Sequence, residues 1–288
     1  MTIAFLNGDF LPLSEAKISP MDRGFLFGDG IYEVIPTYQA KPVGMKGHMA
    51  RLKSGLSAIS ITNPYDETQW RDILATLVEK NSPYIPSGNI GIYFHVSRGT
   101  DSKRFHAFPD NIAPTVFGFA FEIAPAQPLN KHDVKAFKVA LEEDKRWQRC
   151  HIKSTSLLGN VLHFQTGVEQ GVNETILHNS AGEITEASSC NVFIVKNNVV
   201  YTPPLDNQLL PGITRSIALE AFTRASIEVE ASRFSIDDLL NADEVWLSSS
   251  SKEIAPVVEV NGMAIGDGNV GDMWQKAIKA YHDYKFIA

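Results

Sequence analysis

Cysteine is scarce in this sequence, and long apolar runs are absent. The 288 residues include only Cys150 and Cys190, and so few cysteines in a chain of this length predict free thiols, a reducing compartment and therefore a cytoplasmic protein. No apolar run approaches the roughly 20 residues that span a bilayer, and the N-terminus lacks the pattern of a signal peptide. The sequence therefore predicts no membrane partner.

An excess of positive charge and metal-binding motifs are also lacking. The net charge is -7 and the isoelectric point is about 5.6, which argues against non-specific nucleic-acid binding. The eight histidines show no HExxH motif and the cysteines form no paired CxxC, so we predict no metal site. With 44% hydrophobic and 20% charged residues, the composition is that of a globular protein. Small-molecule partners are expected.

The first half of the chain mixes helices with strands. Apolar residues recur on one helical face in two segments, and the second begins with a capping pair, Asp66 and Gln69. Two later segments have the apolar pattern of strands. These features predict a small N-terminal α/β domain, residues 1–124. The predicted elements are helices 48–59 and 66–81 and strands 90–96 and 115–123.

A segment rich in proline and polar residues, 125–133, is the predicted interdomain linker. Beyond it, short apolar segments alternate with turn signals, including a hairpin with Asn197 and Asn198 at its turn. A larger C-terminal domain, 134–288, is therefore predicted as a barrel-like sheet with helices, which makes the fold class mixed α/β and α+β. The predicted elements are strands 137–141, 175–178, 192–202 (the hairpin), 227–229, 245–247 and 257–260, and helices 159–170, 214–225, 235–240 and 272–284.

Lys153 is the candidate covalent anchor of a cofactor. A lysine forms a Schiff base only as the neutral amine, which burial or neighbouring cations favour by lowering its pKa. Four basic side chains precede it closely, namely Lys145, Arg146, Arg149 and His151. Taken alone, this stretch also fits a basic, solvent-exposed strand.

The segment LPGITR, 210–215, is a candidate phosphate site. Proline and glycine stand directly before a predicted helix, so the amides of Gly212, Ile213 and Thr214 would point outward at the positive end of the helix dipole. The serine run 248–251 offers additional hydroxyl groups. An ordinary turn and an ordinary loop remain the alternatives for these two segments.

Four other side chains are candidates for ligand binding. Glu186 precedes a predicted strand and could pair with a protonated ring nitrogen. Tyr32 follows three glycines whose pattern is not that of a dinucleotide-binding motif. Arg104 and His106 would leave an extended segment on the same side, where a guanidinium and an imidazole could hold a carboxylate. Exposed loop residues are the alternative.

Six segments in this order closely resemble the fold-type IV family of pyridoxal-phosphate enzymes. This family includes D-amino acid, branched-chain and related aminotransferases as well as aminodeoxychorismate lyase. The resemblance covers nearly the whole chain and implies a two-domain fold with a C-terminal pseudo-barrel. The segments are DRGFLFGDGIYEV, RFHAFP, EDKRWQRCHIKSTSLLGN, EITEASSCN, LPGITR and SSSSKEIAPV.

The resemblance implies a role for each matched residue and pyridoxal 5'-phosphate as the cofactor. Lys153 resembles the catalytic lysine, which holds the cofactor as a Schiff base and later moves a proton, and Glu186 resembles the carboxylate that keeps the pyridine nitrogen protonated. Ser250 replaces a threonine, and Cys190 replaces a serine, of the family patterns. The remaining cofactor-binding residues implied by the resemblance are Arg51, Leu210, Ile213, Thr214 and Ser250.

The pair Arg104 and His106 distinguishes among members of the family. It resembles the RxH pair of D-amino acid aminotransferases, which implies that Tyr32, Arg104 and His106 hold the substrate carboxylate. Because the last two would come from the neighbouring subunit, the resemblance also implies a homodimer with a shared active site. Leu158 stands where branched-chain enzymes carry tyrosine, and EASSCN differs from their EGAGEN pattern.

The predicted reaction is the transfer of an amino group from a D-amino acid such as D-alanine to a 2-oxo acid such as 2-oxoglutarate or pyruvate, by a ping-pong cycle. An L-branched-chain aminotransferase, or an enzyme similar to aminodeoxychorismate lyase, is the alternative within the same fold. A more remote alternative is a non-catalytic protein that binds pyridoxal phosphate.

Overall fold

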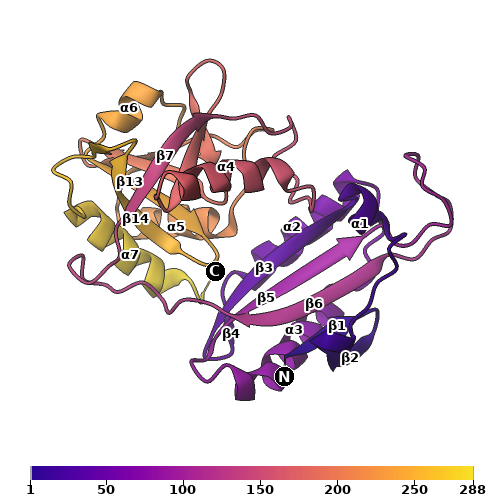
Figure 1. Cartoon of the computed structure of the whole chain (residues 1–288). Helices are drawn as coiled ribbons and strands as arrows, with labels where there is room; N and C mark the ends of the chain where they lie inside the picture. Colours follow the sequence, from indigo (N-terminus) through magenta and orange to yellow (C-terminus); the bar gives the residue numbers. More distant parts are fainter. Residues whose placement is uncertain (1, 288) are drawn as a thin grey trace. The chain divides into compact units, whose positions relative to one another are not determined.

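A computed structural model of the chain describes residues 2–287 (Figure 1). The chain divides into two compact units. The first unit runs to Pro125 and also includes Ile152–Leu157, and the second comprises Ala126–His151 and the chain from Leu158 onward. The predicted linker, 125–133, thus has its first residue in the first unit and the others in the second. Residues 1 and 288, the outer bounds of the two predicted domains, lie outside the described residues.

The first unit is built on a six-stranded antiparallel sheet in the order β2-β1-β6-β5-β3-β4 (Figure 1). Its three long central strands pair along their whole lengths. The elements are β1 Ile3–Leu6, β2 Asp9–Pro12, α1 Arg23–Phe27, β3 Gly30–Tyr38, β4 Lys41–Pro42, α2 Met45–Ala58, α3 Glu67–Asn81, β5 Asn89–Ser97 and β6 Thr115–Glu122, with short 3-10 helices at Leu13–Glu15 and Ser82–Tyr84.

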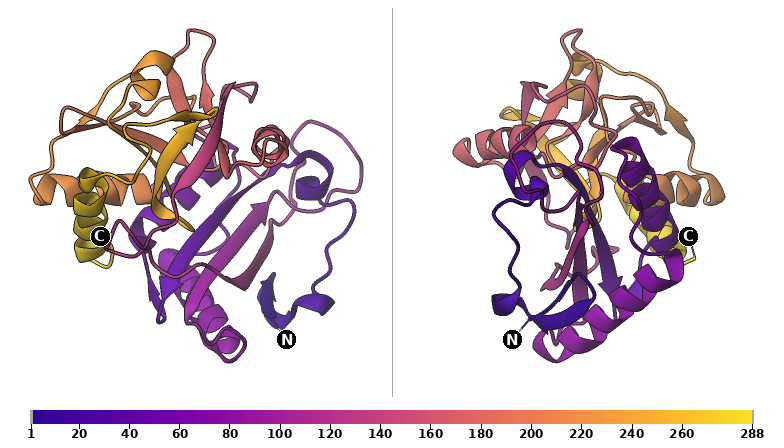
Figure 2. Two further views of the ribbon diagram at one scale, coloured as in Figure 1. Left: turned by 60° about the vertical axis from the view of Figure 1, so that its left-hand side comes forward. Right: turned by 90° about the vertical axis from the view of Figure 1, so that its right-hand side faces the viewer.

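Helices α2 and α3 cover one face of this sheet (Figure 2). Apolar residues at alternate positions of the long strands, such as Ile35, are buried in a cluster with helix residues such as Leu52 and Leu77. Each large apolar side chain buried in this way contributes about 1.5–3 kcal/mol. The intervening side chains, Tyr32 and Tyr93 among them, lie on the other face and are half-buried.

Both helices predicted in the first half are present. α2 begins at Met45 and not at residue 48, because Gly44 takes a left-handed φ of 63° and starts the helix there. α3 has the predicted capping box: Gln69 N donates to Asp66 Oδ1, and Asp66 N donates to Gln69 Oε1, both at 2.9 Å. Local side-chain chemistry therefore sets the start of α3.

The short helix α1, which leads into β3, was not predicted from the sequence. Asp22 caps it by accepting a hydrogen bond from Gly24 N at 2.8 Å. Gly28 ends it with a left-handed φ of 65°. A side chain at position 28 would also collide with Ser156. These two ends turn the chain into β3 and thereby position Tyr32.

The second unit contains a nine-stranded sheet in the order β12-β11-β10-β13-β14-β7-β8-β9, with β15 paired to β14. β9 and β10 are far apart in this order, yet Ala187 N donates to Cys190 O across the short turn between them. The sheet therefore curls back toward itself, and the predicted barrel-like fold is confirmed. The elements are β7 Phe137–Glu143, α4 Leu158–Glu169, β8 Glu174–His178, β9 Ile184–Ala187, β10 Asn191–Lys196, β11 Val199–Thr202, α5 Ile213–Arg224, β12 Val229–Ala231, α6 Ile236–Leu240, β13 Glu244–Ser249, β14 Glu253–Val260, β15 Met263–Ala264 and α7 Asp272–Tyr284.

The predicted helices of this unit are present, and the hairpin turns at Asn197 and Asn198, both of which have positive φ. Several strands differ from the prediction: β14 begins at Glu253, four residues before the predicted strand 257–260, and β15 was not predicted. β12 begins at Val229, where the prediction of residues 227–229 ends. β9 was not predicted, and Glu186 is part of this strand with 4% of its surface exposed. The alternative of an exposed loop glutamate is therefore wrong.

Residues 152–157 belong to the first unit because they hydrogen-bond to the start of β3. Tyr32 N donates to Lys153 O, and Thr155 N donates to Gly30 O, both at 3.0 Å. An antiparallel bridge joins Ile31 and Ser154 between them. The sequence predicts this segment as part of the C-terminal domain, residues 134–288, and the structure differs at this point. Lys153 is thereby brought next to a strand from which it is far apart in sequence.

Candidate active site

In the first unit, Lys153 lies over the ring of Tyr32. Its Nζ is 4.1 Å from the ring centroid, within the range of a cation–π interaction. The lysine is half-buried, so it does not have the environment of a solvent-exposed strand. The backbone pairing of residues 152–157 with β3 holds both side chains on the same stretch of sheet.

The ring of Tyr32 packs against a side chain of the neighbouring strand β5. It stacks on the ring of Tyr93, with centroids 5.7 Å apart, and the Tyr93 hydroxyl lies 3.2 Å from Nδ1 of His95. Burial raises the pKa of Tyr93 to about 12. Tyr93 therefore stays a neutral phenol. The rings of Tyr93 and His95 pack in a row beside Tyr32 and support its side chain.

On the helix side of β3, Glu33 pairs with two side chains of α2. Arg51 donates to Glu33 through Nε at 2.7 Å and through Nη2 at 2.8 Å, and Nδ1 of His48 lies 2.7 Å from Glu33 Oε2. Burial alone would raise the pKa of Glu33, but the Arg51 guanidinium holds it well below its ordinary value. Arg51 is thus oriented by a carboxylate that the sequence reasoning did not consider.

Arg104 and His106 lie in the loop between β5 and β6, which extends away from the sheet (Figure 1). Both are exposed, and both approach the ring of Phe27. The Arg104 guanidinium carbon is 5.2 Å from that ring centroid, and the His106 ring centroid is 5.3 Å from it. The structure therefore brings this pair together on one aromatic ring at the end of α1.

In the second unit, the carboxylate of Glu186 is buried and lies against Arg146. Arg146 Nη1 donates to Glu186 Oε1 at 2.6 Å, while its Nε and Nη2 donate to Asp144 at 3.0 and 2.7 Å. Burial raises the pKa of Glu186, against the opposing effect of Arg146. Two carboxylates thus share one guanidinium, so this cluster carries a net charge of -1 when both are ionised. Arg146, one of the cations expected to favour a neutral Lys153, is neutralised by these partners.

Asn191 connects Glu186 to the loop before α5. Its Nδ2 donates to Leu210 O at 2.8 Å and to Glu186 Oε2 at 3.4 Å, and Leu210 N donates to the same oxygen at 3.0 Å. A Cβ at Gly212 would overlap Asn191 Oδ1, so only glycine permits this close approach. Across the strand pair, Ser248 stands opposite Asn191. Its buried Oγ has no hydrogen-bond partner in the described part of the chain.

The two predicted phosphate-binding segments also lie in the second unit. Gly212 is the N-cap of α5 and provides no side-chain cap for the first amides, those of Ile213 and Thr214. Ser250 is half-buried in the turn between β13 and β14. Lys252 anchors this turn, because its Nζ is 3.5 Å from the fully buried carboxylate of Glu174.

The sequence did not single out Glu33, Asp144 or Asn191 as site residues, and it gave Arg146 a different role. Ser248 was considered only as part of the serine run 248–251. Glu33, Asp144 and Asn191 lie within the quoted motifs, which is the signal that could have singled them out. Their functions arise from contacts between residues distant in sequence, such as Asn191 with Leu210.

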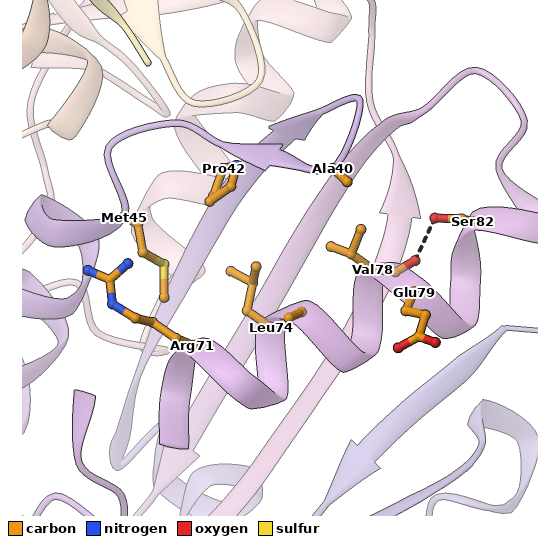
Figure 3. Close-up of a pocket in the computed structure, with 9 residues that line it drawn as sticks. Ala40, Pro42, Met45, Arg71, Leu74, Val78, Glu79 and Ser82 are labelled. Atoms are coloured by element: carbon orange, nitrogen blue, oxygen red, sulfur yellow. Dashed lines mark hydrogen bonds between the residues drawn. The ribbon is translucent and has the colours of Figure 1, made fainter. Parts of the chain in front are cut away.

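A separate groove in the first unit, with a volume of about 390 Å³, lies between α3 and the β4–α2 segment (Figure 3). Its walls are mostly apolar. None of the predicted site residues lines it. The lining residues are Ala40, Pro42, Met45, Arg71, Leu74, Ala75, Val78, Glu79 and Ser82.

Within residues 2–287, no helix combines the length and apolarity needed to cross a membrane.

Comparison with known proteins identifies the family. Residues 30–260 match the model of amino-transferase class IV. The chain is 37% identical to a D-alanine aminotransferase of Staphylococcus haemolyticus over 286 residues, which are 99% of this chain and 98% of that protein. It is 36% identical to a D-alanine aminotransferase of Listeria monocytogenes over 92% of this chain and 90% of that protein.

A solved structure shares the fold. The branched-chain aminotransferase of the thermophilic archaeon Thermoproteus uzoniensis, solved with norvaline, superposes with a TM-score of 0.83 at 22% identity, covering 98% of this chain and 94% of that one. The resemblance read from the six segments is confirmed by the family match and by these relatives. The chain belongs to the class IV aminotransferase family.

Proposed function

We propose that this enzyme transfers the amino group of a D-amino acid, D-alanine or a similar one, to a 2-oxo acid such as 2-oxoglutarate or pyruvate, with pyridoxal 5'-phosphate as cofactor. The observation that carries the proposal is the seating of Lys153 on β3, with Nζ 4.1 Å from the ring centroid of Tyr32. The names of the relatives, D-alanine aminotransferases at 35–37% identity, support the substrate class.

The residues of the second unit fit this cofactor. The cluster of Asp144, Arg146 and Glu186 has one positive and two negative charges in a buried setting, so it favours a cationic partner such as a protonated pyridine nitrogen. Ser248 Oγ, which has no hydrogen-bond partner among residues 2–287, and the first amides of α5, which have no side-chain cap there, offer further hydrogen-bonding groups. When bound, the cofactor supplies an electron sink that weakens the bond between Cα and its hydrogen.

Each predicted site residue would then have a defined role. Lys153 Nζ would hold the cofactor covalently and, as the free amine during the reaction, would move a proton between the substrate Cα and C4′ of the cofactor. Glu186 would keep the pyridine nitrogen protonated. The phosphate group is assigned to Arg51, to the amides of Ile213 and Thr214 and to the Ser250 hydroxyl, and Leu210 would pack on the ring.

The substrate carboxylate is assigned to Tyr32, Arg104 and His106. A guanidinium and an imidazole on one aromatic ring are suited to hold a carboxylate through charge-assisted hydrogen bonds. Because Lys153 delivers its proton to a fixed face, the location of this clamp determines which enantiomer reacts. Because Arg104 and His106 resemble the RxH pair of D-amino acid aminotransferases, this carboxylate site supports a preference for the D-enantiomer.

The proposal includes a homodimer in which Arg104 and His106 serve the active site of the neighbouring subunit. Helix α4 supports it, because four large apolar side chains on one stripe of this helix are exposed by 51–71%. Such a stripe indicates a surface that a second copy covers. The side chains are Leu158, Val161, Leu162 and Val168.

A cytoplasmic location stays a prediction. Both cysteines are free thiols in the structure.

An absorbance titration tests the proposal. The purified protein loaded with pyridoxal phosphate should absorb in the visible range, lose this band with D-alanine and regain it with a 2-oxo acid, whereas L-alanine should have little effect. Borohydride reduction followed by peptide mapping should find a pyridoxyl adduct on Lys153. A larger rate with L-leucine than with D-alanine would favour the branched-chain alternative, and no response to any amino acid would favour a non-catalytic binding protein.

A further inference from the structure

The loop that carries Arg104 and His106 is held by one buried side chain, that of Arg23 in α1. Arg23 is 3% exposed. Its Nη1 donates to Phe105 O at 2.5 Å, and its Nη2 donates to His106 O at 3.2 Å. Both acceptors are backbone carbonyls within the RFH segment. The guanidinium therefore hydrogen-bonds to the two residues that follow Arg104.

The other end of the Arg23 guanidinium is anchored to Asp29. Nε of Arg23 donates to Asp29 Oδ2 at 2.8 Å, and Arg98 donates to both oxygens of Asp29, at 2.8 and 3.0 Å. Burial alone would raise the pKa of Asp29, but the hydrogen bonds from Arg98 and Arg23 hold it below its ordinary value. Asp29 is therefore a fixed anion that orients Arg23 toward the loop.

Phe27 completes the arrangement one turn further along α1. Its ring centroid is 4.9 Å from the guanidinium carbon of Arg23 and 5.2 Å from that of Arg104. The imidazole of His106 contacts the same ring. Arg23 thus sets the backbone of the loop, while Phe27 provides the surface on which the two side chains come together.

We propose that Arg23 is a positioning residue for substrate: it fixes the backbone of Phe105 and His106 so that Arg104 and His106 together form a preorganised carboxylate site. This inference rests on the proposed function, since it assumes that these two side chains hold the substrate. The loop is exposed and has no helix or strand of its own between β5 and β6, so without these two hydrogen bonds its conformation would be far less restricted.

Two measurements on the cofactor-loaded enzyme test the proposal, and the first does not depend on activity. In Arg23→Gln, amide hydrogen exchange over residues 104–108 should be faster by about tenfold or more than in the wild type. The matched control is Arg71→Gln, which removes a helix guanidinium that pairs with Glu67 at an exposed position. Unchanged exchange in the loop of Arg23→Gln would overturn the proposal.

The second measurement is kinetic. The KM for D-alanine should rise about ten- to hundredfold in Arg23→Gln, with a much smaller change in kcat, because the loop acts on carboxylate binding and not on proton transfer. Arg23→Lys keeps a charge beside Asp29 but cannot donate to two carbonyls in a fixed geometry, so it should fold and show an intermediate KM. Equal KM values for wild type, Arg23→Lys and Arg23→Gln would overturn the substrate role.

A double-mutant cycle separates this inference from the proposed function. If Arg23 acts through the loop, Arg23→Gln should add little to the loss in kcat/KM that Arg104→Ala causes, because the two changes disable the same site. Additive losses would overturn the proposal. Faster loop exchange in Arg23→Gln together with a normal KM in Arg104→Ala would show that the clamp assignment fails while the hold of Arg23 on the loop stands.

Discussion

At the scale of single residues, Lys153 and Glu186 have opposite relations to the stability of the fold. Lys153 is half-buried over a tyrosine ring and pairs with no carboxylate that the structure describes. Glu186 is a buried carboxylate that shares the Arg146 guanidinium with Asp144. Removing the lysine should therefore affect chemistry far more than stability, whereas removing the negative charge of the glutamate should also relieve the unfavourable burial of that charge.

Lys153→Ala should lose nearly all transamination, by about 10²- to 10⁴-fold or more from the missing proton transfer alone. The protein should still fold, because the segment is held by backbone hydrogen bonds to β3. Steady-state rates with D-alanine measure the effect, and Lys145→Ala, an exposed lysine eight residues earlier, is the control. Substantial turnover by Lys153→Ala would exclude Lys153 as the proton carrier.

Glu186→Gln should lower activity with D-alanine by about a hundredfold or more, since it removes the carboxylate proposed to pair with the pyridine nitrogen. The cofactor-free variant should not be less stable than the wild type at pH 7. A carboxyl whose pKa is raised in the folded state binds protons more tightly there than in the unfolded chain, so its contribution to stability falls as the pH rises above about 4.5. Urea unfolding of the two cofactor-free proteins measures this, and a marked loss of stability in Glu186→Gln would contradict it.

At the scale of elements, both units bring residues together by joining a loop to a strand. In the second unit, Asn191 at the start of β10 binds the loop before α5, and the absence of a Cβ at Gly212 allows it. In the first unit, Tyr32 and Glu33 lie on opposite faces of β3. Tyr32 contacts Lys153, and Glu33 accepts a hydrogen bond from Arg51 of α2, so one strand positions both side chains.

Gly212→Ala should weaken cofactor binding by about tenfold or more, because the new methyl group displaces Asn191 and with it the first amides of α5. Fluorescence titration of the cofactor-free protein with pyridoxal phosphate measures the affinity. Ser216→Ala changes an exposed position of the same helix and should bind as the wild type does. An unchanged affinity in Gly212→Ala would show that this close approach has no functional role.

Glu33→Gln should destabilise the first unit by about 3–5 kcal/mol, because Arg51 and His48 lose the anion that faces them. The pKa of Glu33 is lowered in the folded state, so its contribution is complete above its ordinary value of 4.5 and is lost as the pH falls. The difference in unfolding free energy between wild type and variant should therefore shrink from pH 7 toward pH 3. A difference that is constant with pH would contradict this assignment.

At the scale of the whole molecule, the apolar stripe on α4 would stay exposed to solvent in a monomer, and a dimer contact would explain it. Leu162→Glu, at a position that is 61% exposed, should change the fold of one chain little but should convert the proposed dimer to monomers, because a charge would be buried without a partner at the subunit contact. Sedimentation velocity measures this, with Ser216→Glu on α5 as the control. A monomeric wild type would rule out the shared active site.

The prediction from sequence succeeded where the signal was local. The capping box of α3, the periodicity of the helices and the order of the six segments are all features of neighbouring residues, so the fold class and the family were predictable. Lys153, Glu186 and the RFH segment were singled out from local motifs as well, and their roles stay predictions.

Only the tertiary structure decided what surrounds them. The pairing of Arg146 with Glu186, the hydrogen bonds of residues 152–157 to β3, and those of Arg23 to the loop bearing Arg104 all connect positions that are distant in the chain. The geometry of such contacts depends on which distant segments pack together, and the pattern within one segment does not name its partner. The chain itself determined which chemical groups are present, and the packing of its sheets determined their partners and charges.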